Sequence, residues 1–106
     1  MDNIRIIYKI LHTLEISMDY EEFDDKMISS STLGISEARL LSILRMLLIA
    51  GLIEGIAVDT DAAGNFQVSK GRPRLTLKGL EYLNENGMMQ RAMKMAKGIK
   101  DSIPGL

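Results

Sequence analysis

The sequence predicts a mainly α-helical domain with a small β-hairpin, an α+β fold, on three observations. A helical pattern ends at a glycine turn, Gly34, and a second helix starts at Ser36. Two short alternating segments then flank a turn-rich loop over residues 61–65, and further helical patterns complete the chain. Helix, tight turn, helix and hairpin is the order of a winged helix-turn-helix, here with a C-terminal helical extension.

The first helix is expected from Asp2 to about Ser17, where apolar residues recur at steps of three and four. Ile6 and Ile10 lie off the main stripe, which indicates a helix covered on more than one side. An acidic segment over residues 19–25 is expected to lead into a helix around Asp24–Leu33. The stripe expected to face the core consists of Ile4, Ile7, Leu11, Leu14 and Met18.

The third helix is the best delimited element of the sequence. Gly34 can take the positive φ that ends a helix, and Ser36 is a good N-cap for the next one. This helix is expected to run from Ser36 to Ala50 and to end at Gly51. Helical spacing predicts a core face of Leu40, Ile43, Leu44 and Leu47 and an outer face of Ala38, Ser42, Arg45 and Ile49, flanked by Arg39 and Met46.

The second half of the chain predicts a hairpin and two helices. Apolar residues alternate on either side of the loop at 61–65, and Pro73 confines the second strand to an edge or ends it. Thr76 is expected to cap a helix that stops at Asn86-Gly87, before a basic helix from Met88 to about Ile103. We therefore expect a winged-helix domain over residues 1–87 and, over residues 88–106, a methionine-rich helix packed on that domain or on a dimer partner.

Composition places the chain among small intracellular domains. Its 106 residues, 46% of them apolar, suffice for a core, and the absence of cysteine excludes disulfides and thiolate sites. No apolar run approaches the roughly 18 residues that span a bilayer, and the N-terminus does not read as a signal peptide. We expect a cytoplasmic protein. The net charge of −1 divides into −4 over residues 1–35 and +3 over residues 36–106, so one face can still meet an anionic partner.

Two groups of residues are candidates for binding double-stranded DNA. The third helix offers Ser36, Arg39, Ser42 and Arg45, because a helix fits the major groove and arginine pairs with guanine. The alternative is an ordinary solvated face, or one that packs on a protein partner, as its exposed apolar residues favour. The second group suits a wing on a phosphate backbone, or else a solubilising loop that pairs with the acidic segment, and consists of Lys70, Arg72, Arg74 and Lys78.

The last helix combines an apolar stripe with Arg91, Lys94, Lys97 and Lys100. It can pack on the first helix of its own domain or form the seam of a homodimer, because methionine repacks easily. Membrane binding is not expected, since no Trp or Phe anchors the helix. The residues of the dimer seam would be Met88, Met89, Ala92, Met93, Met95, Ala96 and Ile99.

The sequence offers no pattern typical of an enzyme or of a cofactor or metal site. Asp59 and Asp61 begin like a calcium loop, but Lys70 stands at the twelfth position, where a bidentate Glu is needed. His12 is the only histidine and has no second nitrogen or sulfur ligand in its pattern. The serines at 29–31 lack a histidine base, and no phosphate-binding glycine loop is present.

Two segments carry a family resemblance. Residues 32–36 with Ala50-Gly51-Leu52-Ile53-Glu54 look like a general helix-turn-helix pattern. The more specific segment, LTLKGLEYLNENG over residues 75–87, resembles the part after the wing in the small YjcQ-like proteins of Firmicutes and their phages, which also end in a lysine-rich helix. The resemblance implies the winged-helix fold over most of the chain. A fold does not by itself give a function.

These observations favour a DNA-binding accessory or regulatory protein that contacts DNA through the third helix and the basic wing. The alternative is a protein-interaction module that keeps the same fold and uses the apolar outer face of the third helix. A continuous positive strip that joins Arg39, Arg45 and the wing would favour DNA. An apolar patch around Met46 and Ile49 that merges with the methionine helix would favour a protein partner.

Overall fold

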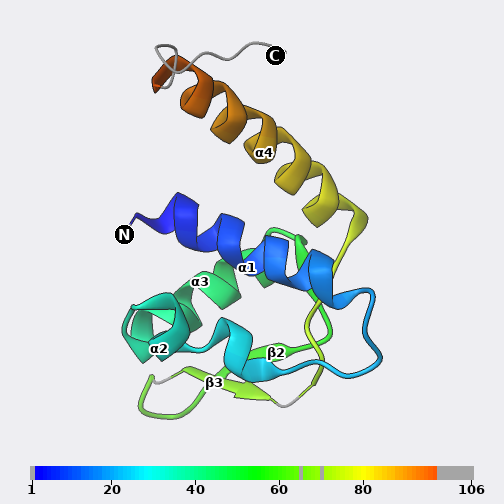
Figure 1. Cartoon of the computed structure of the whole chain (residues 1–106). Helices are drawn as coiled ribbons and strands as arrows, with labels where there is room; N and C mark the ends of the chain where they lie inside the picture. Colours follow the sequence, from blue (N-terminus) through cyan, green and yellow to red (C-terminus); the bar gives the residue numbers. More distant parts are fainter. Residues whose placement is uncertain (1, 65, 70, 98–106) are drawn as a thin grey trace.

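The computed structural model describes residues 2–64, 66–69 and 71–97, and of residues 58, 60, 66–69 and 88–97 only the backbone. Within this part the chain is mainly helical, with two short antiparallel strand pairs, and is therefore an α+β fold (Figure 1). The elements are α1 (Asn3–Ser17), η1 (Asp25–Ile28), α2 (Ser30–Leu33), α3 (Glu37–Ile49), β1 (Ile53–Glu54), β2 (Ala57–Thr60), β3 (Phe66–Ser69), β4 (Arg74–Leu75) and α4 (Leu77–Lys97).

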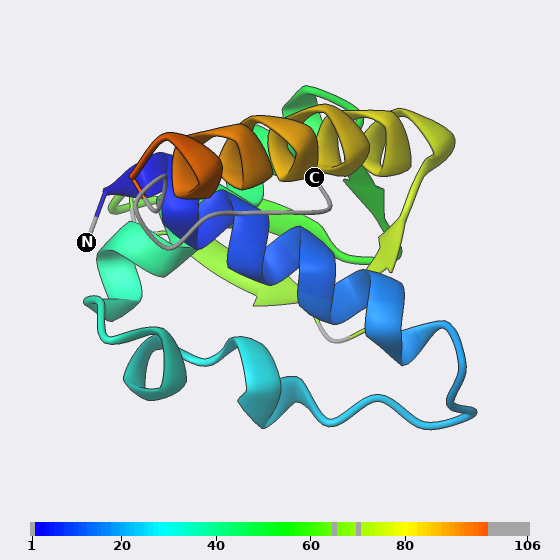
Figure 2. The ribbon, with the colours of Figure 1, turned by 45° about the horizontal axis from the view of Figure 1, so that its top comes forward.

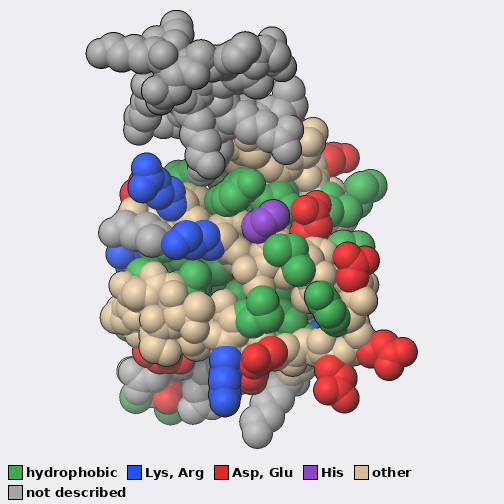
Figure 3. Space-filling model, in the orientation of Figure 1, with side chains coloured by type: hydrophobic (Ala, Val, Ile, Leu, Met, Phe, Trp, Pro, Cys, Tyr) green, Lys and Arg blue, Asp and Glu red, His purple; other side chains and the backbone are tan. Residues whose placement is uncertain are grey.

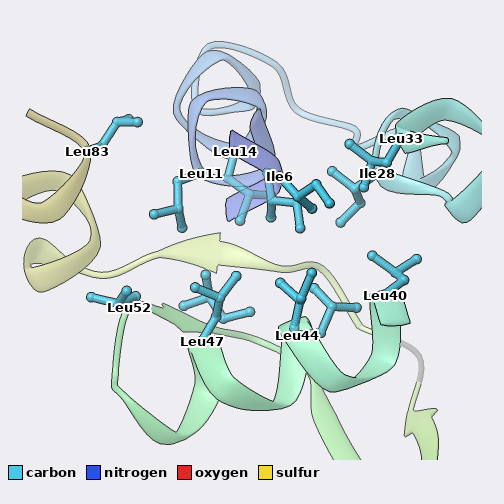
Figure 4. Packing of buried hydrophobic residues seen from close by; sticks show 13 residues of the cluster. Ile6, Leu11, Leu14, Ile28, Leu33, Leu40, Leu44, Leu47, Leu52 and Leu83 are labelled. Carbon is cyan, nitrogen blue, oxygen red and sulfur yellow. The ribbon is translucent and has the colours of Figure 1, made fainter. Parts of the chain in front are cut away.

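The core lies between α1 and α3 and is closed at one end by α4 and at the other by η1 and α2 (Figure 4). The predicted inner face of α3 is confirmed, because Leu40, Ile43, Leu44 and Leu47 are all buried. Each fully buried side chain of this size stabilises the fold by about 1.5–3 kcal/mol. The remaining buried apolar residues are Ile6, Ile10, Leu11, Leu14, Ile28, Leu33, Leu52, Ile53 and Leu83.

The predicted stripe of α1 is wrong at both ends. Ile4 and Met18 are exposed, whereas Ile6 and Ile10 are fully buried. The reason is that α1 is covered by the core on one side and by α4 on another, so the buried face is centred on the row of residues 6, 10 and 14, while the prediction is confirmed at Leu11 and Leu14. The expectation that α1 is covered on more than one side is confirmed.

The turn between α2 and α3 has the predicted geometry. Gly34 is left-handed with φ 71°, and the Ser36 hydroxyl accepts a hydrogen bond of 3.1 Å from the Arg39 backbone N–H. The single helix expected around 24–33 is divided into η1 and α2 at Ser29. This division arises because the Ser29 hydroxyl caps α2, accepting a 3.2 Å hydrogen bond from the backbone N–H of Thr32.

The hairpin is confirmed, and it is longer than the alternating pattern indicates. β2 pairs with β3 in the register Ala57↔Ser69, and β1 pairs with β4 in the register Ile53↔Leu75. The two strand pairs are separated at Gly55, which lies between β1 and β2 and has a φ of 91°. A Cβ at Gly55 would overlap the carbonyl oxygen of Arg72, so the close approach of the two backbones requires glycine.

α4 is one continuous helix, so the expected stop at Asn86-Gly87 is wrong. The Asn86 side chain donates a 2.9 Å hydrogen bond back to the Tyr82 carbonyl, four residues earlier, instead of ending the helix. The predicted cap is confirmed, because Thr76 Oγ1 accepts from the Gly79 N–H at 3.0 Å. α4 runs antiparallel to α1 and lies across it (Figure 2). The expected boundary between residues 87 and 88 therefore falls inside α4.

Candidate nucleic-acid interface

The outer face of α3 is the surface on which the nucleic-acid hypothesis depends. Ser42 and Arg45 lie exposed near its middle, and Ala38 is exposed one turn before Ser42. Met46 and Ile49, 48% and 71% exposed, complete the same face. The face opposite the core is therefore open to solvent along the whole helix, as the helical spacing predicts.

Two predicted contact residues at the start of α3 have structural roles. The hydroxyl of Ser36 is committed to capping the helix. The guanidinium of Arg39 lies at the edge of the outer face and donates from Nε and Nη2 to the Asn3 side-chain oxygen, at 2.9 and 2.7 Å. Asn3 is at the start of α1, so this contact holds the first turns of α1 and α3 together. No pattern in the sequence indicates that these two residues meet.

Arg72 lies against the end of α1 rather than on the outside of the hairpin. Its Nη2 donates to the carbonyl oxygens of Ser17 and Tyr20, at 2.9 and 2.6 Å, and its Nη1 donates to the carbonyl of Glu21. The Ser17 carbonyl ends the last turn of α1 and the other two follow it, where the backbone acceptors have no partner within the helix. This arrangement matches the alternative in which the basic segment pairs with the acidic segment of its own molecule.

The other candidate cations are spread over the base of the hairpin. Arg74 Nε lies 3.9 Å from a carboxylate oxygen of Glu54 on the paired strand, with both side chains mostly exposed. Lys78 is exposed in the first turn of α4, near Gly51 at the end of α3. Lys70 lies outside the described residues. The structure thus brings Ser42 and Arg45 together on one face and leaves Arg72 and Arg74 apart from it.

Charge is unevenly distributed over the face shown in Figure 3, in which acidic side chains gather toward the lower right and basic ones toward the left. The loop between α1 and η1, on the right in Figure 1, and the first residue of η1 together contribute five exposed carboxylates. They belong to Asp19, Glu21, Glu22, Asp24 and Asp25. A polyanion would be repelled by this corner and would approach the molecule from elsewhere.

A hollow at the same corner was not expected from the sequence. It has a volume of about 350 Å³ and lies between the end of α1 and η1, with Ile16, Tyr20, Phe23 and Met27 among its lining residues. Tyr20 and Phe23 stand out in the sequence as aromatic residues within an acidic segment. Their pairing with Ile16 and Met27 depends on the fold of the loop.

Neither a metal site nor a membrane span is found in the described part of the chain. No group of three or more His, Asp or Glu side chains is arranged there to hold a metal ion. None of its helices combines the length and apolarity that a membrane span requires. The carboxylate of Asp61, once considered for a calcium loop, accepts a 2.9 Å hydrogen bond from the Ala63 N–H and so stabilises the turn of the hairpin.

Comparison with known proteins decides the family. The model of the YjcQ protein family matches residues 8–102, a range that includes α1 from Tyr8 onward and every later element. The chain belongs to the YjcQ family. Uncharacterized protein YjcQ of Bacillus subtilis (strain 168) is 33% identical over 76 residues, which cover 72% of this chain and 78% of the Bacillus protein. No solved structure matches the chain.

Proposed function

We propose that this YjcQ-family chain is a winged-helix protein that binds double-stranded DNA by placing α3 in the major groove. The observation that supports this most directly is the open outer face of α3, where Ser42 and Arg45 are exposed side by side. The major groove is wide enough to admit an α-helix, and arginine is the side chain most often paired with guanine. Ala38 and Ile49 on the same face would suit contact with thymine methyl groups.

The order of the elements supports the winged-helix part of the proposal. η1 and α2 lead through the left-handed Gly34 into α3, and the β2–β3 hairpin follows directly. In helix-turn-helix proteins the helix after the turn is the one that enters the groove. The hairpin also contacts α3, so it would serve as the wing beside the groove. The protein would act in the cytoplasm as an accessory or regulatory factor, with no catalytic role.

Fewer residues are proposed to contact DNA than the sequence alone suggests. Arg45 and Ser42 would read or contact the groove, and Arg39 would lie at its edge. Arg74 and Lys78 are surface cations that could approach phosphates at the base of the hairpin. Arg72 is left out, because binding a phosphate would require it to release three backbone carbonyls.

The test is the salt dependence of binding to a labelled random-sequence duplex of about two helical turns, followed by fluorescence anisotropy. Wild-type protein is expected to bind at low salt. Arg45→Ala, which removes the proposed groove contact, is expected to weaken binding. Lys78→Ala, which removes a cation proposed to approach a phosphate, is expected to reduce the slope of log affinity against log salt by about 0.9, the value for one lost phosphate contact. Arg5→Ala removes the same charge from the exposed surface of α1 and is the matched control. Absence of binding by the wild type at low salt would overturn the proposal.

A second candidate function rests on a different observation. Met46 and Ile49 expose apolar surface on the very face that would enter the groove, 48% and 71% respectively. Such residues are better covered by protein than by phosphates. The positive strip expected between α3 and the hairpin is also interrupted, because Arg72 faces α1. A protein-interaction module that uses the outer face of α3 is therefore the alternative if the duplex does not bind.

A further inference from the structure

The hollow at the end of α1 is mainly apolar. Ile16, Tyr20 and Met27 line it and remain 43%, 62% and 45% exposed, while Phe23 reaches from the hollow into the edge of the core. Glu22 and Asp24 complete its wall. Apolar side chains that converge on a hollow and stay this exposed are typical of a surface that another chain covers.

The wall of the hollow is held in place by the rest of the fold. Arg72 binds the carbonyl oxygens of Ser17, Tyr20 and Glu21 from behind. On the other side, the Asp24 carboxylate accepts a 3.0 Å hydrogen bond from the Lys26 N–H and starts η1. The loop therefore has a fixed shape before any partner binds, which reduces the ordering that binding would otherwise require.

The charge around the hollow selects the kind of partner. Five carboxylates lie within residues 19–25, and no Lys or Arg occurs between Lys9 and Lys26. An occupant must therefore combine apolar side chains for the hollow with positive charges for the rim. Anionic partners, including DNA and acidic membranes, are repelled by this corner.

This chain carries a segment with that chemistry in the second half of α4. Residues 88–97 contain four methionines and two alanines, and their three charged residues, Arg91, Lys94 and Lys97, are all basic. On a helix, Met88, Ala92 and Met95 fall on one face, while Lys97 falls on the opposite one. Long basic side chains can extend along the apolar surface to reach a charged rim, and methionine adapts to irregular hollows.

The occupant cannot be the α4 of the same molecule. α4 runs antiparallel to α1, so its second half lies toward the N-terminal end of α1 (Figures 1 and 2). The hollow is at the other, C-terminal end of α1. Gly87 is opposite Tyr8, near the N-terminal end of α1. Only five residues of α1 precede Tyr8, but ten residues of α4 follow Gly87, so α4 extends past α1 by about 7 Å at 1.5 Å per residue.

We propose that the acidic apolar hollow binds the basic, methionine-rich half of α4 from a second copy of this chain. The exchange is reciprocal: each protomer offers one hollow and one helix, which gives a closed two-fold dimer. The sequence suggests α4 as a dimer seam, and the hollow supplies the receiving surface. The inference does not depend on DNA binding.

Charge reversal with the full-length chain tests the pairing. Wild-type protein is expected to sediment as a dimer at low salt and to dissociate as salt rises. Glu21→Lys/Glu22→Lys and Lys94→Glu/Lys97→Glu should each be monomeric. Mixed in equal amounts the two variants should dimerise again, because a reversed hollow meets a reversed helix and a native hollow meets a native helix. Asp59→Lys/Glu81→Lys reverses two exposed carboxylates elsewhere and should dimerise like the wild type.

Single cysteines give a second readout, since the chain has none of its own. Met27→Cys and Met95→Cys, mixed and oxidised, are expected to form a disulfide-linked species that contains one copy of each. Circular dichroism and thermal unfolding confirm that every variant is folded. The proposal is overturned by a wild type that stays monomeric up to about 1 mM, by reversal variants that dimerise normally, by a mixture that stays monomeric, or by cysteines that link only like with like.

Discussion

The guanidinium of Arg72 donates a 2.9 Å hydrogen bond to the carbonyl oxygen of Ser17, the last residue of α1, across 55 residues of sequence. The same group binds two further carbonyls in the loop that follows. The hairpin thereby caps α1 with a charged donor, which complements the negative end of the helix dipole. A residue expected on the outside of a wing instead joins the hairpin to the first helix.

Arg72→Ala should therefore destabilise the fold. Hydrogen bonds to charged groups contribute about 1.5–3 kcal/mol each where they are sheltered. This set, with one partly buried bond and two exposed ones, should be worth about 2 kcal/mol in total. Arg74→Ala, two residues later, is the matched control, because its 3.9 Å ion pair with Glu54 is mostly exposed and worth at most about 1 kcal/mol. Urea unfolding of both variants measures the difference, and equal losses would contradict this role of Arg72.

Two glycines of α4 should respond to alanine with opposite signs. A Cβ at Gly79 would overlap the Leu52 carbonyl oxygen and lie 2.9 Å from the Leu75 side chain. Such overpacking costs about 1–3 kcal/mol and outweighs the gain of about 1 kcal/mol in helix propensity. A Cβ at Gly87 meets nothing closer than the Tyr8 hydroxyl at 3.8 Å, so Gly87→Ala should stabilise the helix by about 0.5–1 kcal/mol.

Thermal unfolding measures both glycine variants. In a domain of this size each kcal/mol moves the midpoint by about 4–8 °C, so the two midpoints should move in opposite directions by an easily measured amount. A rise for Gly79→Ala would mean that α4 can shift away from Leu52. A fall for Gly87→Ala would mean that the helix does not continue through residue 87.

These residues also show what the sequence can and cannot predict. Gly34, Ser36 and Thr76 are predicted correctly because a turn or a cap depends on neighbours three or four residues away. The partner of Arg72 is not predictable in this way, since 55 residues separate it from Ser17. The sequence alone predicts a helix stop at Gly87, because its packing beside Tyr8 on α1 is not visible in the local pattern.

In the candidate interface, too, some features follow from local spacing and others depend on residues far apart in the sequence. Helical spacing predicts the outer face of α3, with Ser42 and Arg45 exposed together. Helical spacing does not predict the hydrogen bond between Arg39 and the side-chain oxygen of Asn3, which lies 36 residues earlier in the sequence. Charge along the sequence suggests one basic strip, whereas the fold separates Arg72 from α3. The local pattern therefore locates the surface, and tertiary contacts decide which charges are on it.

Ser36→Ala tests whether Ser36 acts as a cap rather than as a DNA contact. Loss of the hydroxyl that accepts from the Arg39 N–H should reduce the free energy of unfolding by about 1 kcal/mol, and Ser36→Asp should restore most of it. Ser42→Ala, on the exposed face of the same helix, should change stability by less than about 0.5 kcal/mol. Urea unfolding compares the three variants. An Ser36→Ala protein as stable as the wild type would rule out the capping role.

Ile49→Lys distinguishes the two proposed functions by adding a charge rather than removing one. Ile49 is 71% exposed, so the substitution should leave the fold intact. If the outer face of α3 enters DNA, the new cation should strengthen binding to a random duplex and steepen the salt slope by about 0.9. Met18→Lys, 63% exposed just after the end of α1, adds the same charge away from that face and is the control. Equal strengthening by both variants would show that only net charge matters, and no change in duplex binding with Ile49→Lys would favour a protein partner for the outer face of α3.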